Sequence, residues 1–186
     1  MGTEIEKKYR IGSEEATRLR ERLRAVGAEA RGEEFEENTL YTGPGLEQGN
    51  RVLRLRRVEG RAVFTFKESM ASASGIKRRR EDETTVGDAA ALAAILDALG
   101  YAPAVLYEKR RETWRVAGVE VVIDELPFGL FVEIEGEEES ILKAERLLEL
   151  DAATMEPKSY PQLTLLHGTR GDTIVEARFT GGREDV

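Results

Sequence analysis

The sequence predicts an α+β fold that is mainly β, on three observations. Charged and apolar residues alternate along one segment after another, as they do when side chains point to opposite faces of a strand. Glycine and proline separate these segments into strand-sized pieces. The same order of elements also occurs twice along the 186 residues, a length that suits one domain.

In the first half, residues 3–11 have the alternation of a strand. Ser13 is the predicted N-cap of the helix that follows, Glu14 and Glu15 suit its positive end, and Gly27 can end it. The remaining predicted elements are a strand within 33–43, a loop over 43–50, a hairpin over 51–69 that turns at Glu59 and Gly60, and a loop over 70–76.

The second half begins with a predicted strand over 77–86 and a helix over 87–101 capped by Asp88. The later predicted elements are a hairpin over 104–116 and 119–126 turning at Ala117 and Gly118, a strand over 130–136, a helix over 138–150, and a short helix over 158–166 with Ser159 as its cap. Residues 173–181 fit either a late strand or a tail.

An internal repeat connects the two halves. Glu4 and Glu6 stand before the first helix as Glu81 and Glu83 stand before the second, and a strand and a hairpin follow each helix. This order predicts two pseudo-symmetric βαβββ-like halves. Because no linker rich in Pro, Gly or Ser separates them, we expect a single domain over 1–167, with 168–186 as a C-terminal strand or tail.

Composition excludes several classes of protein. The net charge of −8 argues against a generally basic nucleic-acid binder. The absence of cysteine excludes disulfides, thiolate catalysis and cysteine-ligated zinc. Since no apolar run approaches the roughly 20 residues of a membrane span, we expect a cytoplasmic protein with no membrane partner.

Rows of charge on the predicted strands leave two arrangements open. In the first, each strand packs its apolar face on a core and shows its charges to water as cross-strand pairs. In the second, the sheet closes with its apolar faces outward under the helices and its charges inside. Many basic side chains on one open face would repel one another, which favours the second arrangement.

A closed, charged interior would need a ligand of particular chemistry. Its arginine and lysine side chains require a polyanion, and its carboxylates require cations. Polyphosphate with a divalent metal satisfies both, because carboxylate oxygens suit Mg²⁺ or Mn²⁺ and guanidinium groups suit phosphate oxygens.

At this point the motifs resemble a known family. Glu4-x-Glu6-x-Lys8 is similar to the ExExK signature of the CYTH superfamily, the triphosphate tunnel metalloenzymes. Further segments fall in the family's order, and they are Leu53–Arg56, Thr65–Lys67, Lys77–Glu83, Glu108–Trp114, Ile123–Gly136 and the SYPQLTLL run from Ser159. The chain looks most like the bacterial branch of class IV adenylyl cyclases and triphosphatases. It departs from the family at Tyr41-Thr42-Gly43, where members often have Tyr-Asp-Thr.

The resemblance implies an eight-stranded antiparallel closed barrel, the triphosphate tunnel, with a charged interior and helices packed outside. It implies metal binding by Glu4, Glu6, Glu133 and Glu135, with Asp124 as a ligand or a supporting residue and Mg²⁺ or Mn²⁺ as the cofactor. The implied catalytic residues are Lys8, Glu4 and Glu6. The implied phosphate-binding residues are Lys8, Arg54, Arg56, Lys67, Lys77, Arg79, Lys109 and Arg111, and Glu81 and Glu83 would support the metal or orient the bases.

The expected function is hydrolysis of a triphosphate that is inorganic, thiamine-linked or nucleoside-linked. A class IV adenylyl cyclase that converts ATP to cyclic AMP and pyrophosphate is the alternative, and a non-catalytic polyphosphate- or nucleotide-binding module is the second. Expected partners are the small-molecule triphosphate and, from the resemblance, a second copy in a homodimer, with no nucleic acid. Asp124 also fits a purely structural role as the partner of Lys109 or Arg111.

Overall fold

The computed structural model describes residues 2–46, 51–70, 77–150 and 153–180, without the side chains of residues 2–4, 70, 77 and 78. Three predicted segments therefore lie partly outside the described residues. They are half of the loop at 43–50, nearly all of the loop at 70–76, and residues 181–186 of the tail.

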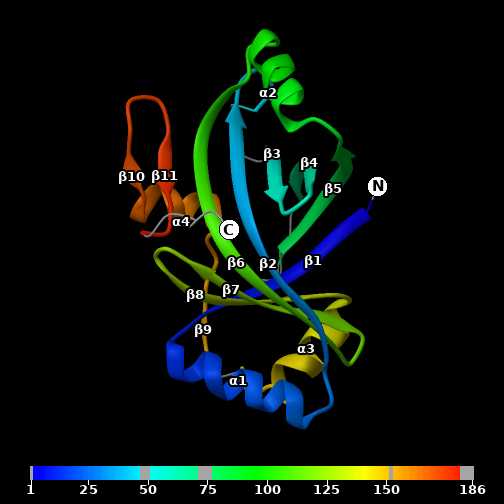
Figure 1. Cartoon of the computed structure of the whole chain (residues 1–186). Coiled ribbons are helices and arrows are strands. Elements are labelled where there is room, and N and C mark those ends of the chain that lie inside the picture. The colour runs from blue at the N-terminus through cyan, green and yellow to red at the C-terminus, as the bar shows by residue number, and fades with distance from the viewer. Residues whose placement is uncertain (1, 47–50, 71–76, 151–152, 181–186) are drawn as a thin grey trace.

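Four helices and eleven strands make up the described chain (Figure 1). The helices are α1 (Ser13–Ala25), α2 (Ala89–Ala98), α3 (Glu138–Leu147) and α4 (Tyr160–His167). The strands are β1 (Gly2–Ile11), β2 (Glu29–Thr42), β3 (Arg51–Val58), β4 (Arg61–Met70), β5 (Lys77–Val86), β6 (Ala102–Val116), β7 (Val119–Leu126), β8 (Gly129–Glu135), β9 (Thr154–Met155), β10 (Thr169–Arg170) and β11 (Val175–Ala177).

The mainly β composition and the predicted order of elements are confirmed. Each half contains a strand, a helix and three further strands, from β1 to β4 and from β5 to β8. Both predicted hairpins are present. The turn between β6 and β7 has positive φ at Ala117 and Gly118, as a two-residue hairpin turn of type I′ requires.

The prediction of an eight-stranded antiparallel closed barrel was wrong. The strands form one sheet of eleven strands in the order β10-β11-β6-β2-β3-β4-β5-β1-β8-β7, with β9 beside β1 and an additional pairing of β6 with β7. The sheet is also mixed, because β11 runs parallel to β6. The physical reason lies in the C-terminal quarter, whose short strands β9, β10 and β11 add to β1 and β6 and extend the sheet beyond the eight predicted strands.

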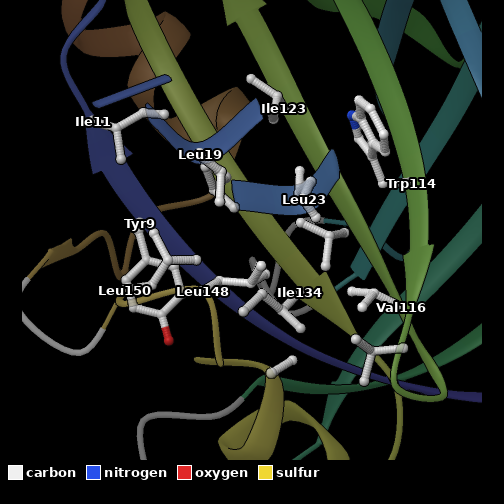
Figure 2. Packing of buried hydrophobic residues seen from close by; sticks show 14 of the residues in the cluster. Tyr9, Ile11, Leu19, Leu23, Trp114, Val116, Ile123, Ile134, Leu148 and Leu150 are labelled. Carbon is white, nitrogen blue, oxygen red and sulfur yellow. The ribbon is translucent and has the colours of Figure 1, made fainter. Parts of the chain in front are cut away.

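Helices cover the apolar face of the sheet at its two ends. Leu19 and Leu23 of α1 pack with Ile123 and Ile134 of β7 and β8 in the largest buried cluster, which also takes in Trp114 (Figure 2). Helix α2 lies at the opposite end from α1 (Figure 1). Its Leu96 packs with Tyr41, Leu55 and Ala62 of β2, β3 and β4. Alternate residues of these strands must therefore point to the other, charged face.

Helix caps follow the predicted chemistry with one shift. Asp88 accepts hydrogen bonds of 2.9 Å from the N–H groups of Ala90 and Ala91. Ser159 is the N-cap of α4, and its N–H donates to the Gln162 side chain over 2.8 Å. Helix α1 is capped by Gly12 rather than Ser13, because the Gly12 N–H donates to the Glu15 carboxylate over 2.6 Å.

The C-terminal part of the described chain is attached to β6. Strand β11 pairs with β6 beside Val105 and Tyr107, and Leu163 of α4 packs in the same buried cluster as Tyr107. Within the described ranges, no helix combines the length and the apolar character needed to cross a membrane.

Candidate functional site

Charged side chains from eight strands line one face of the sheet, which we call the charged face. Its members come from alternate positions of β1 to β8, apart from Tyr160, which α4 contributes. They are Glu6, Lys8, Glu36, Asn38, Arg54, Arg56, Thr65, Lys67, Arg79, Glu81, Glu83, Lys109, Arg111, Asp124, Glu133 and Tyr160. Several are almost inaccessible, with Asp124 and Glu36 at 0% exposure and Lys109 at 2%. Burial of this many charges requires that they neutralise one another or a ligand.

Glu36 contacts charged-face residues of β2, β3 and β6. Its carboxylate is 3.4 Å from the Lys109 ammonium and 3.5 Å from the Arg56 guanidinium, and Asn38 donates to it over 3.2 Å. Burial alone would raise the pKa of Glu36, but the positive charges of Lys109, Arg111 and Arg56 hold it far below its usual value. Glu36 is therefore a fixed negative charge.

Asp124 organises the neighbouring bases. The Arg111 guanidinium donates to both of its oxygens, over 2.8 and 2.6 Å, and the Tyr160 hydroxyl donates over 2.8 Å. The Lys109 ammonium adds a bond of 3.3 Å. These contacts fit the structural role open for Asp124, as the partner of Lys109 and Arg111.

Glu133 connects Asp124's partners to β1. Its carboxylate accepts from Arg111 over 2.8 Å and lies 3.2 Å from the Lys8 ammonium. Burial would raise the pKa of Glu133, but Lys8 and Arg111 hold it well below its usual range. Burial and the charge of Arg111 lower the pKa of Lys109 to about 8, although Asp124 and Glu36 act in the opposite direction.

A second group of contacts joins β3, β4 and β5. The Arg54 guanidinium donates to the Thr65 hydroxyl over 3.3 Å and lies 3.9 Å from Glu81 and 4.0 Å from Glu83. The Lys67 ammonium is 3.0 Å from Glu81. Glu81 and Glu83 thus lie beside these bases.

Several buried polar atoms of the charged face make no hydrogen bond within the described chain. They are the Nε atoms of Arg54 and Arg56, Oε1 of Glu36 and Oδ1 of Asn38. An unsatisfied buried donor costs about 1–3 kcal/mol, so such atoms mark places where a ligand or water completes the network. Two guanidinium donors side by side suit an anion.

The carboxylates of β1 and β8 fit a divalent cation by their chemistry and their register. Glu6 is directly opposite Glu135 across the two strands, and Lys8 is opposite Glu133. Like charges in directly opposite positions repel each other unless a cation lies between them. Glu6 also pairs with Arg79 over 3.1 Å, and among the described side chains no group of three or more acidic residues is gathered as a ready metal cage.

The structure brings most predicted site residues together and leaves a few apart. On the charged face lie Glu6, Lys8, Arg54, Arg56, Lys67, Arg79, Glu81, Glu83, Lys109, Arg111, Asp124 and Glu133. Glu135 shares this face but is exposed. For Glu4 and Lys77 the structure describes only the backbone, which places Glu4 opposite Arg79 and Lys77 opposite Glu6.

Sequence reasoning missed Glu36, Asn38 and Tyr160. Residues 33–38 contain acids at both parities, so alternation did not separate Glu36 from its exposed neighbours. Tyr160 belongs to a helix, and strand periodicity has no bearing on it. The signal available for Glu36 was its parity with Asn38 and Leu40, both buried.

Comparison with known proteins identifies a family and a named relative. Residues 2–160 match the CYTH domain. The protein named "Putative adenylate cyclase MJ0240" of Methanocaldococcus jannaschii is 24% identical over 148 residues, which are 78% of this chain and 84% of that protein.

Two solved structures have the same fold. The PH1012 protein of Pyrococcus horikoshii OT3 superposes with a TM-score of 0.75 at 25% identity, over 86% of this chain and 98% of the other. A Hippeastrum protein, HpAC1, superposes with a TM-score of 0.64 at 16% identity, over 87% and 94%. It is named an adenylyl cyclase and described as having a dominant triphosphatase activity.

Proposed function

The chain belongs to the CYTH domain family, and from that premise we propose that it is a divalent-metal-dependent enzyme that hydrolyses a triphosphate. CYTH family members are triphosphatases or adenylyl cyclases, which supports an enzyme acting on a phosphoanhydride. Hydrolysis requires a bound triphosphate and one water, whereas cyclisation also requires a shaped nucleoside pocket. The Hippeastrum protein of the same fold, described as mainly a triphosphatase, supports this preference.

The main support for triphosphate binding is the pair of guanidinium groups on β3. Arg54 and Arg56 point to the charged face from alternate positions, and the buried Nε of each makes no hydrogen bond within the described chain, although the Arg56 Nε lies 3.5 Å from the Glu36 carboxylate. Oxygens of a triphosphate would satisfy these donors and offset the positive charge of Lys8, Lys109 and Arg111. A surface of solvated ion pairs would not leave such donors buried.

The reaction balances without a covalent intermediate. Water attacks the terminal phosphorus and gives up a proton to solvent, a new P–O bond forms, and the bridging P–O bond breaks to release orthophosphate and a diphosphate. The basic side chains bind the phosphate oxygens and stabilise negative charge on the leaving diphosphate. Mg²⁺ or Mn²⁺ held by Glu6, Glu133 and Glu135, with Glu4 beside them on β1, would supply Lewis-acid polarisation of the phosphate oxygens.

The named relative in Methanocaldococcus jannaschii favours the alternative, an adenylyl cyclase. There the ribose 3′-hydroxyl of ATP attacks the α-phosphorus, and pyrophosphate leaves as cyclic AMP forms. The same charged face would bind the triphosphate in either reaction, so the nucleophile distinguishes the two.

Product analysis by chromatography tests the proposal. The protein is incubated separately with tripolyphosphate, thiamine triphosphate and ATP, each with Mg²⁺, with Mn²⁺ and with EDTA. Orthophosphate with a diphosphate supports hydrolysis, and cyclic AMP with pyrophosphate supports the cyclase. No turnover of any substrate, together with binding that EDTA does not change, would establish the binding module instead.

A pair of variants tests the metal carboxylates. Glu6→Ala should abolish turnover while the protein stays folded, since it removes a proposed metal ligand from the charged face. Glu125→Ala is the matched control, because Glu125 points outward from β7 and pairs with the exposed Arg110. Unchanged turnover in Glu6→Ala would contradict the metal assignment.

A further inference from the structure

Tyr160 places an aromatic ring from α4 against the charged face. It is the first residue of that helix and is 5% exposed. Its ring packs edge-on against Phe131 of β8, with 5.5 Å between centroids, and lies 6.1 Å from the ring of Tyr107 of β6. These contacts fix the plane of the ring.

Two ammonium groups lie near the face of this ring. The Lys8 Nζ is 3.7 Å from the ring centroid, and the Lys109 Nζ is 5.4 Å from it. Both distances are within the range of a cation–π interaction, which is strongest where water is excluded. Lys8 and Lys109 are 3% and 2% exposed, so the ring replaces part of the hydration that these ammonium groups lose.

The same segment makes two further contacts with these bases. The Lys8 ammonium donates to the backbone carbonyl of Lys158 over 3.2 Å. The Tyr160 hydroxyl donates to Asp124 over 2.8 Å, and Asp124 in turn holds Lys109 and Arg111. Residues 158–160 therefore contact three basic side chains, directly or through one carboxylate.

The position of Tyr160 is itself held from both sides. Ser159 and Gln162 cap α4, and the Thr164 hydroxyl donates to the Tyr160 carbonyl over 2.8 Å. After the helix, β11 pairs with β6, the strand that carries Lys109. The ring consequently has little freedom to move away from the lysines.

We propose that Tyr160 is a positioning residue whose ring holds the Lys8 and Lys109 ammonium groups in place for a bound triphosphate. This inference rests on the proposed function for its substrate, but the ordering of the two lysines can be tested without it. The ring carries the effect, and the hydroxyl acts on Asp124.

Three variants separate these contributions. Tyr160→Leu removes the ring, and Tyr160→Phe keeps the ring and removes the hydroxyl. Phe128→Leu is the matched control, because Phe128 belongs to the same aromatic cluster, 6.1 Å from the Phe131 ring, whereas the ring beside the two lysines is that of Tyr160. Should Tyr160→Leu fail to fold, Tyr160→Met, which has a long flexible side chain, takes its place.

The first readout is reductive methylation of lysines followed by mass spectrometry, which needs no substrate. We expect the labelling rates of Lys8 and Lys109 to rise about tenfold in Tyr160→Leu, because this variant loses a desolvated cation–π interaction. They should change less than about threefold in Tyr160→Phe and in Phe128→Leu. Equal labelling of both lysines in folded Tyr160→Leu and in the unchanged protein would overturn the proposal.

The second readout is binding of tripolyphosphate by titration calorimetry, with steady-state kinetics where turnover occurs. We expect Kd and KM to rise about tenfold in Tyr160→Leu, and Tyr160→Phe to restore most of the loss. Failure of the unchanged protein to bind tripolyphosphate would count against the proposed function alone, since the labelling result still decides the role of Tyr160. A fall in kcat with unchanged Kd and KM would overturn the positioning role.

Discussion

Arg111 and Asp124 lie opposite each other on the paired strands β6 and β7, and the guanidinium donates to both carboxylate oxygens over 2.8 and 2.6 Å. Burial alone would lower the pKa of Arg111, but Asp124 holds it well above its usual value, with Glu36 and Glu133 acting in the same direction. The pair also ties Lys109 and Tyr160 to the sheet through Asp124. Asp124 is therefore the common partner of Arg111, Lys109 and Tyr160.

Asp124→Asn should destabilise the protein by about 3–5 kcal/mol, because Arg111 and Lys109 would remain buried with one fewer counter-charge. Urea unfolding of the purified variant measures the loss. Glu125→Gln is the control, since Glu125 forms an exposed pair with Arg110 and its loss should cost about 0.5 kcal/mol or less. Equal stability of the two variants would contradict the structural role of Asp124.

How far the sequence predicts the site depends on the regularity of each strand. Arg54 and Arg56 alternate with Leu53 and Leu55, and period 2 alone places both arginines on one face, as the structure has them. Glu36 lies in a run with acids on both parities, so its burial depends on which neighbour β2 pairs with, a fact about tertiary structure.

The fold was predicted in its element order but not in its closure. Helix caps and hairpin turns are local signals, and Asp88 and Ala117 have the local roles expected of them. The pairing of β11 with β6 joins residues about 70 positions apart, and a three-residue strand carries too little pattern to indicate its partner. The sequence therefore could not show that the sheet extends beyond eight strands.

Arg56→Ala should lower kcat/KM for the preferred triphosphate by roughly 10- to 100-fold, the range for a charge-assisted hydrogen bond. Burial and the nearby charge of Arg54 lower the pKa of Arg56, whereas Glu36 raises it. Removing the guanidinium relieves one unfavourable burial but leaves the buried Glu36 with one fewer counter-charge, so the variant should also lose some stability. Steady-state kinetics and urea unfolding together check this.

Arg57→Ala provides the matched comparison on the same strand. Arg57 points to the opposite face of β3 and pairs with Glu37 over 3.3 Å. Its removal should leave kcat/KM within about twofold of the unchanged value, since it cannot reach the charged face. Similar losses in Arg56→Ala and Arg57→Ala would place the binding surface elsewhere.

Because of Lys109, we expect the stability of the folded protein to rise with pH in the alkaline range. Burial and Arg111 lower its pKa in the folded protein from 10.5 to about 8, against the opposing charges of Asp124, Glu36 and Glu133. Between these values the unfolded chain binds more protons than the folded one, so the free energy of unfolding increases with pH. The gain from this group should be about 2 kcal/mol between roughly pH 7 and pH 9.5.

Denaturant unfolding across that pH range measures the slope, and Lys109→Met should remove it. Lys143→Met is the control, because Lys143 is an exposed partner of Glu139 on α3 and should leave the slope unchanged. If the free energy of unfolding depends on pH identically with and without Lys109, the pKa of this side chain is not lowered by folding.

Arg178 should hold the C-terminal segment against the sheet. Its guanidinium donates to Glu37 of β2 over 2.9 Å, to Glu108 of β6 over 3.0 Å and to Glu176 of β11 over 3.2 Å. Arg178→Ala should lower stability by only about 1 kcal/mol, because the network is partly exposed. A protease should then cleave the variant after α4 faster than it cleaves the wild-type protein. Arg170→Ala, a substitution in β10, is the control and should not accelerate this cleavage. If Arg178→Ala leaves the cleavage rate unchanged, the pairing of β11 with β6 holds the segment without Arg178.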